Sequence, residues 1–152
     1  MNFKDSQNKI VKIDDILKSI ENKNEYKIYI GTDSQLDRKE KKAVYATCIV
    51  LYTVGSGGKI FTSRHQAKIP SSLKERLANE VWRSLEVAMT LSSLNINITV
   101  HVDVNKSTKF KSGNYSEEMI SMVTSQGFKC QIKPDSFAAS TVADRFVKKE
   151  YR

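Results

Sequence analysis

The order of the strand-like segments constrains the fold of this chain more than any other feature. Three segments rich in β-branched and aromatic residues follow one another at 26–32, 43–53 and 59–68. The glycine-rich sequence Gly55-Ser-Gly-Gly58 between the last two is typical of a hairpin turn. These segments therefore predict a three-stranded antiparallel meander.

A long amphipathic helix is predicted after the meander, ending at about Leu94. Ser71 or Ser72 is the expected N-cap, and Glu75 occupies the capping-box position relative to Ser72. One apolar stripe runs along this helix at helical spacing and consists of Leu73, Leu77, Val81, Leu85 and Ala88.

Two further strands alternate with helices in the rest of the chain. Residues 95–102 alternate apolar and polar side chains and predict a fourth strand, and 128–133 predict a fifth. The helix between them is expected to be capped by Ser116 and to end at Gly127. A last helix is expected over 142–151.

The N-terminal part contains less apolar sequence. Residues 1–9 are polar and are expected to be frayed, whereas 14–22 have the apolar spacing of a short helix. We therefore expect one α/β domain over 1–152, in which 1–25 form a helical extension and 26–152 form the core. The predicted core is a five-stranded mixed sheet flanked by helices.

The composition restricts the class of protein. No segment has the roughly 18 consecutive apolar residues of a membrane-spanning helix, and the first residues lack the apolar centre of a signal peptide. Cys48 and Cys130 lie in separate strand-like runs without the spacing of a zinc site, so both are expected to be buried, reduced thiols. These features predict a cytoplasmic protein.

The net charge of +8 favours a polyanionic partner. The first 30 residues are nearly neutral, so most of the excess positive charge lies in the remainder. Nucleic acid is the expected partner. The alternative is that the lysines serve only solubility.

Four carboxylates stand out by their positions in the predicted elements. Asp33 and Asp103 are each expected at the end of a strand, which suggests a shared divalent-metal site. Glu80 borders the buried stripe of the long helix, and Asp144 lies in the first turn of the last helix. Asp135, directly after the fifth strand, is the alternative to Asp144.

Each acid also has a purely structural interpretation. Asp33 is able to start an Asx-turn before Ser34, and Asp103 is able to cap the loop after its strand. Glu80 is compatible with a solvated helix position, and Asp144 with a favourable interaction with the helix dipole.

This arrangement resembles the ribonuclease H-like superfamily. A meander followed by α-β-α-β-α is the order of that fold, and its acids lie on the first strand, the first core helix, the end of the fourth strand and near the last helix. The sequences Ile30-Gly-Thr-Asp-Ser-Gln35, His101-Val-Asp-Val104 and Lys133-Pro-Asp-Ser-Phe-Ala-Ala-Ser-Thr-Val-Ala-Asp144 are similar to the uncharacterised bacterial YkuK-like family of predicted ribonuclease H-like nucleases. The resemblance covers roughly 25–150.

The resemblance implies a phosphodiester hydrolase with two Mg²⁺ or Mn²⁺ ions. It assigns Asp33 to bridge both ions, Glu80 and Asp103 to one ion, and Asp144 to the other. The chain lacks a histidine between Lys133 and Asp144, where ribonuclease H itself often has one.

The loop after Asp103 is basic. Lys106, Lys109 and Lys111 are candidate contacts to a phosphate backbone, and Ser34 and Gln35 beside Asp33 are candidate contacts to phosphate or sugar. The expected function is a metal-dependent nuclease. The alternatives are an inactive nucleic-acid-binding module of the same fold and a Holliday-junction resolvase.

Overall fold

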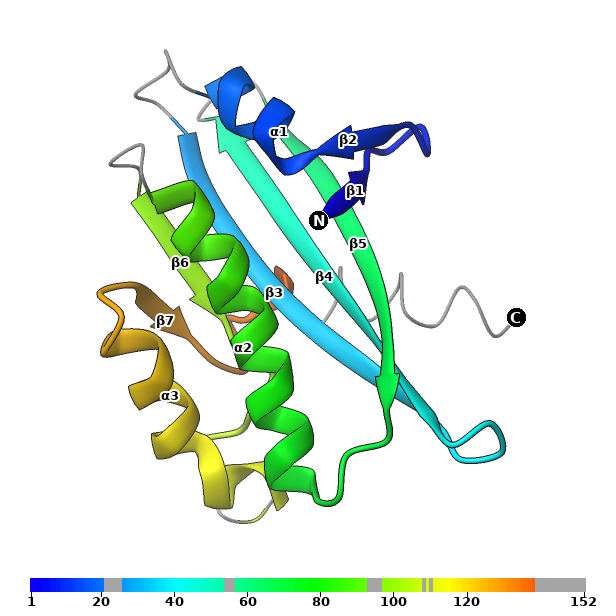
Figure 1. Ribbon diagram of the computed structural model, residues 1–152. Coiled ribbons are helices and arrows are strands. Elements are labelled where there is room, and N and C mark those ends of the chain that lie inside the picture. Colours follow the sequence, from blue (N-terminus) through cyan, green and yellow to red (C-terminus); the bar gives the residue numbers. More distant parts are fainter. Residues whose placement is uncertain (21–25, 54–56, 93–96, 108, 110, 139–152) are drawn as a thin grey trace.

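The computed structural model describes residues 1–20, 26–53, 57–92, 97–107, 109 and 111–138 (Figure 1). Within these ranges the chain forms a seven-stranded mixed sheet in the order β2-β1-β5-β4-β3-β6-β7. The strands are β1 (Asn2–Lys4), β2 (Ile10–Lys12), β3 (Tyr26–Asp37), β4 (Lys42–Thr53), β5 (Gly57–Lys68), β6 (Asn97–His101) and β7 (Lys129–Gln131). The helices are α1 (Ile13–Ile20), α2 (Leu73–Leu91), α3 (Ser116–Thr124) and the 3₁₀ turn η2 (Lys111–Tyr115).

The predicted meander is confirmed and is longer than expected. β3 pairs antiparallel with β4 from Tyr26↔Thr53 to Asp37↔Lys42, and β4 pairs antiparallel with β5 over its whole length. β6 then joins the other side of β3 in parallel, and β7 joins β6 in parallel. The sheet is therefore mixed, as the order of the elements predicted.

The expectation of a frayed N-terminus and a five-stranded sheet was wrong. β1 pairs antiparallel with β2, with Phe3 opposite Val11, and Lys4 pairs with Thr62 of β5. The Phe3 side chain is 0% exposed and belongs to the main core. One aromatic residue in a polar stretch gives no periodic pattern, so these two strands depend on a distant core that local sequence does not display.

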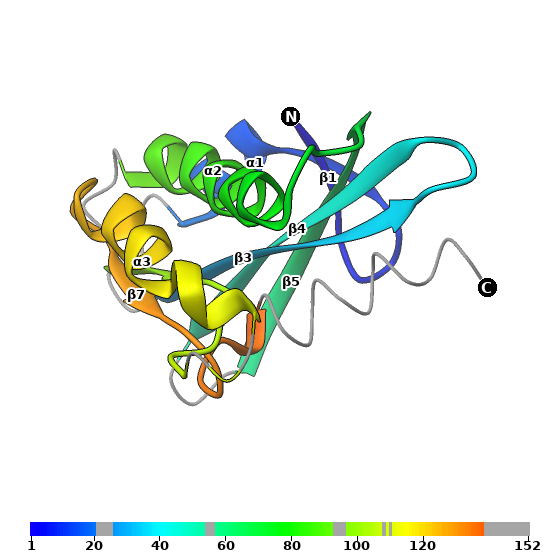
Figure 2. The ribbon, with the colours of Figure 1, turned by 90° about the horizontal axis from the view of Figure 1, so that it is seen from below.

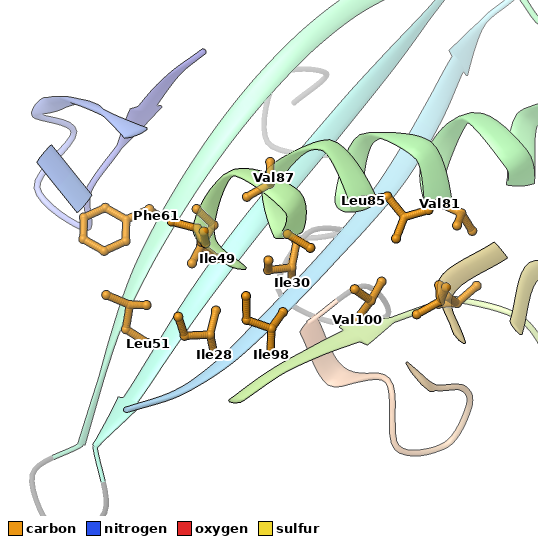
Figure 3. Packing of buried hydrophobic residues seen from close by; sticks show 14 of the residues in the cluster. Ile28, Ile30, Ile49, Leu51, Phe61, Val81, Leu85, Val87, Ile98 and Val100 are labelled. Carbon is orange, nitrogen blue, oxygen red and sulfur yellow. The ribbon is translucent and has the colours of Figure 1, made fainter. Parts of the chain in front are cut away.

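Helix α2 covers one face of the central strands (Figures 1 and 3). Its stripe residues Leu77, Val81, Leu85 and Ala88 are buried against side chains such as Ile30 and Val100. Ser72 is the N-cap, because its hydroxyl accepts a hydrogen bond from the Glu75 amide at 3.1 Å. The helix ends at Leu91, three residues before the predicted end.

Two details of the C-terminal half differ from prediction. Ser116 is the first residue of α3 and not its cap, because its hydroxyl donates to the Gly113 carbonyl at 3.1 Å. Gly127 follows the helix with φ +89°, as expected for a glycine that ends a helix. The predicted helix 142–151 lies outside the described residues.

The opposite face of the sheet carries a smaller apolar cluster around Cys48, Val50 and Ala138. The Cys48 thiol donates to the Ala138 carbonyl at 3.0 Å, and the Ala138 amide donates to His101 Nδ1 at 3.1 Å. Figure 2 shows the segment leading to residue 138 on the far side of the sheet from α1 and α2. Cys48 and Cys130 are both free thiols, as expected; Cys48 is buried, whereas Cys130 is only half-buried, contrary to the prediction.

The described helices include none that is both long enough and apolar enough to span a bilayer.

Candidate active site

Asp33 lies within β3 and not at its end, which corrects the sequence-based placement. The strand continues to Asp37, and Asp33 pairs with Ala46 of β4. The apolar run stops at Gly31, but the ladder with β4 continues through the polar residues that follow. Asp33 is only 9% exposed, so its carboxylate sits in a largely desolvated position.

Asp103 lies beside the same part of β3. The last parallel pair between β3 and β6 is Gly31↔His101, and β6 ends there. Asp33 and Asp103 each follow that pair by two residues. The two acids therefore lie in corresponding positions on neighbouring segments, where the parallel pairing stops.

Glu80 is brought to the same region by α2. It is only 6% exposed, and its Oε2 accepts a hydrogen bond of 2.7 Å from the Ser34 hydroxyl. The neighbouring turn of the helix is tied to β3 as well, since the hydroxyl oxygens of Ser84 and Thr32 lie 2.7 Å apart. The candidate acid on the long helix therefore faces the sheet and not solvent.

Arg76 completes a chain of hydrogen bonds to Glu80. Its Nε donates to the Ser34 hydroxyl oxygen at 2.7 Å, and its Nη2 donates to the Ser34 carbonyl at 2.7 Å. Ser34 thus accepts from Arg76 and donates to Glu80. The sequence analysis missed Arg76, although its position one turn before Glu80 places it on the same side of the helix.

The environment of Glu80 favours its protonated form. Burial raises the pKa of Glu80 well above its usual range, and the negative charge of Asp33 raises it further. The Ser34 hydrogen bond and Arg76 oppose this shift, whereas Asp103 adds to it. Glu80 therefore interacts electrostatically with both other acids.

Asp103 has a basic partner that the sequence analysis also missed. Lys133 Nζ lies 3.0 Å from Asp103 Oδ1. The two residues are brought together after β6 and β7 end, where the Lys133 amide donates to the Val104 carbonyl at 3.2 Å. The Asp103 carboxylate remains partly accessible, with 19% of its side chain exposed.

The donor set suits a hard divalent cation. Asp33, Glu80 and Asp103 offer carboxylate oxygens, which Mg²⁺ and Mn²⁺ prefer. In the part of the chain that the structure describes, no three His, Cys, Asp or Glu side chains are close enough to hold a metal ion. Ser34 holds Glu80 and Lys133 holds Asp103, so these two acids have other partners in this arrangement.

The predicted nucleic-acid contacts lie in two places. Lys106 and Lys109 are exposed in the loop after Asp103, and Lys111 begins η2. Gln35 follows Ser34 on β3 and is half-buried. The Ser34 hydroxyl already donates to Glu80 and accepts from Arg76, so it could donate to a substrate phosphate only in place of Glu80.

The fourth acid is not placed. Asp144 lies outside the described residues. Its alternative, Asp135, is exposed in a turn, where its amide donates to the Ile132 carbonyl at 2.9 Å.

His101 has a structural position. It is buried between the rings of Tyr29 and Phe137, and burial lowers the pKa of His101 to about 4. Because Nδ1 accepts from the Ala138 amide, the neutral ring carries its proton on Nε2. Among the described residues, Nε2 has no hydrogen-bond partner.

Comparisons with known proteins agree on the fold family. The family model for Ribonuclease H-like proteins matches residues 10–148. The chain is 32% identical over 141 residues to the uncharacterized protein YkuK of Bacillus subtilis (strain 168), covering 81% of this chain and 80% of that protein.

Two solved structures are similar at lower levels. One is the ribonuclease H1 of the halophilic archaeon Halobacterium salinarum NRC-1, with 14% identity, a TM-score of 0.42 and coverage of 82% of this chain and 98% of that one. The other is the Argonaute of Marinitoga piezophila in complex with a 5′ OH guide RNA, with 17% identity and a TM-score of 0.42. The match covers 74% of this chain but spans only 17% of the Argonaute.

Proposed function

We propose that this chain, which belongs to the ribonuclease H-like family, is a divalent-metal-dependent nuclease that hydrolyses phosphodiester bonds. The observation that supports this most strongly is the position of Glu80. It is buried on α2, where burial raises its pKa most, and Asp33 on β3 and Asp103 after β6 raise the pKa further. Three neighbouring carboxylates are costly to keep ionised in a desolvated site, and a bound divalent cation would offset that cost in place of protonation of Glu80.

The residues that would hold the metal are Asp33, Glu80 and Asp103, with Asp144 as the fourth acid. Asp33 is the candidate to bridge two ions, as the resemblance to the ribonuclease H-like family implies. Asp135 is the alternative to Asp144. Mg²⁺ or Mn²⁺ bound there would supply charge stabilisation to the attacking and leaving oxygens of a phosphodiester.

The remaining residues orient these carboxylates. The Ser34 hydroxyl fixes one oxygen of Glu80, and Arg76 fixes Ser34 through two donors. Arg76 and Ser34 are therefore proposed as positioning residues that limit the rotation of the Glu80 carboxylate.

The nucleic-acid partner is proposed from charge. The chain has a net charge of +8, and Lys106 and Lys109 are exposed directly after Asp103. Together with Lys111 and Gln35, they are the candidate contacts to a phosphate backbone that approaches the acids.

The second candidate function is a nucleic-acid-binding module without catalysis. The ion pair between Lys133 and Asp103 favours it, because a cationic side chain at 3.0 Å occupies the surroundings in which a metal would bind Asp103. In this case the carboxylates would be structural and charge removal would leave binding intact or stronger.

The deciding experiment is a cleavage assay with labelled RNA/DNA hybrid, single-stranded RNA and DNA, duplex DNA and a four-way junction, with Mg²⁺ or Mn²⁺. We expect the wild type to cleave one of these substrates. Asp33→Asn and Asp103→Asn should each lower the cleavage rate by about 100-fold or more. Mutation of a residue that only supports a metal ligand already costs about 10- to 100-fold in activity, and loss of the ligand itself should cost at least as much.

Asp37→Asn is the matched control. Asp37 lies on the same strand and accepts a hydrogen bond from the Glu40 amide at 3.1 Å, away from Glu80. It should cleave like the wild type. If the wild type binds nucleic acid without cleaving it, and Asp33→Asn binds equally well, the nuclease proposal is contradicted and the binding module is supported.

A further inference from the structure

A groove lies between α2 and the strands β4 and β5, on the same face of the sheet as Glu80. Its volume is about 590 Å³, and its walls include Tyr45, His65, Asn79, Trp82, Arg83 and Glu86. A smaller hollow of about 260 Å³ shares His65 and Arg83 with it and continues toward Arg64. In Figure 1, α1 lies over the upper ends of β4 and β5, whereas their lower parts run beside α2.

Trp82 is the unusual member of this groove. It is the only tryptophan in the sequence, and its side chain is 51% exposed on α2. Single exposed apolar residues are normal on protein surfaces. An exposed indole in the wall of a groove, with an arginine beside it, is instead suited to stacking against a flat ring.

The arginine next to Trp82 is held in a defined position. The Arg83 guanidinium lies 5.1 Å from the centre of the Tyr45 ring, and the Tyr45 hydroxyl accepts a hydrogen bond of 3.2 Å from Asn79. Partial burial lowers the pKa of Arg83, but a guanidinium remains charged at neutral pH. Tyr45, held by Asn79, therefore fixes the position of the Arg83 cation beside the indole.

The cation of the groove is Arg83. It lines both hollows, whereas Arg64 lines only the smaller hollow and Glu86 lines only the larger one. His65 adds an imidazole ring, and burial and Arg83 lower its pKa although Glu86 opposes this shift. A guanidinium group, an exposed indole and an imidazole are groups that bind the phosphates and bases of a single strand.

We propose that this groove binds single-stranded nucleic acid, with a base stacked on Trp82 and a backbone phosphate contacting Arg83. Tyr45 of the groove is paired with Ser34 of β3, whose hydroxyl bonds to Glu80, so the groove begins beside the candidate active site. It would hold a single-stranded extension of the nucleic acid whose cleavage is proposed above. The inference rests on that proposed function for the class of ligand, but binding here does not require cleavage.

Tryptophan fluorescence tests this directly, because Trp82 is the sole source of the emission. Short oligothymidylate and oligouridylate are titrated into the protein in the presence of EDTA. Comparison of the two titrations shows whether DNA or RNA is the preferred ligand. We expect quenching that saturates together with the anisotropy of a labelled oligonucleotide. Heparin, a polyanion without bases, should compete for binding and produce much less quenching.

The variants assign the effect to the groove. Trp82→Ala should weaken oligonucleotide binding roughly 5- to 100-fold, as expected for loss of one stacked base, and Arg83→Gln should weaken it and reduce its salt dependence. Tyr52→Ala removes another exposed aromatic residue, and Lys129→Gln removes an exposed cation on β7. Both controls should bind like the wild type.

The outcomes separate this inference from the nuclease proposal. If the wild type cleaves a substrate, its Trp82 emission does not change, and Trp82→Ala binds oligonucleotide like the wild type, the groove is not a nucleic-acid site. The proposed nuclease activity would be unaffected by that result. Quenching without cleavage of any substrate would support the groove alone. A wild-type dimer that Trp82→Ala converts to a monomer, without nucleic-acid quenching, would reassign the groove to self-association and overturn the inference.

Discussion

Ser34 on β3 donates a hydrogen bond of 2.7 Å to Glu80 on α2, and this bond joins the central strand to the long helix at the candidate active site. Both groups are buried, and Ser34 also accepts from Arg76. A single hydroxyl thereby satisfies a buried carboxyl group and a partly buried guanidinium.

Removal of this hydroxyl should destabilise the protein. Ser34→Ala leaves Glu80 and Arg76 without their shared partner, and we expect the free energy of unfolding to fall by about 1–3 kcal/mol. Chemical denaturation measures the change. The control is Ser125→Ala, which removes an exposed hydroxyl that bonds to the Met122 carbonyl and should change stability by less than about 0.5 kcal/mol. Equal losses in the two variants would contradict a special role for Ser34.

Glu80 should make stability depend on pH in a defined direction. Its folded-state pKa is raised well above the ordinary value of 4.5, so the folded protein binds more protons than the unfolded chain between those two values. Stability must therefore decline as pH rises through this window. Glu80→Gln, which keeps an acceptor for Ser34, should remove this decline and raise Tm at neutral pH in EDTA. Parallel curves of Tm against pH for the two proteins would refute it.

Lys133 should compete with a metal ion for Asp103. We expect Lys133→Gln to tighten Mn²⁺ binding by about 3- to 10-fold, because it removes a positive charge 3.0 Å from Asp103 Oδ1. Stability should change little, since partly exposed ion pairs contribute about 0–1 kcal/mol. Calorimetric titration with Mn²⁺ measures the affinity, and Lys129→Gln is the control. Weaker Mn²⁺ binding by Lys133→Gln would oppose this assignment.

Phe3 should contribute to stability despite its place near the N-terminus. Its side chain is fully buried in the main core, so Phe3→Ala is expected to cost about 3–5 kcal/mol. Asn2 is exposed, and Asn2→Ala should change stability by less than about 0.5 kcal/mol. Thermal unfolding distinguishes this from a frayed terminus, for which both substitutions would be neutral.

The sequence by itself determined the order of the main elements. The runs at 26–32, 43–53 and 59–68 had local β patterns that survive in β3, β4 and β5, and the stripe around Leu77 and Leu85 identified the buried side of α2. These predictions succeeded because alternation and helical spacing are local consequences of a buried face. The family resemblance drawn from the same residues agrees with the match over 10–148.

Only the tertiary structure decided which groups meet. Asp33 is inside a strand because the ladder with β4 continues past the apolar run, and β1 exists because Phe3 reaches the core beside β5. Arg76 contacts the site because α2 packs on β3, and Lys133 contacts it because the segment after β7 lies beside Asp103. Neither contact follows from the sequence alone. Hydrogen bonds and ion pairs depend on distances between elements far apart in the chain, and periodicity along the sequence carries no information about those distances.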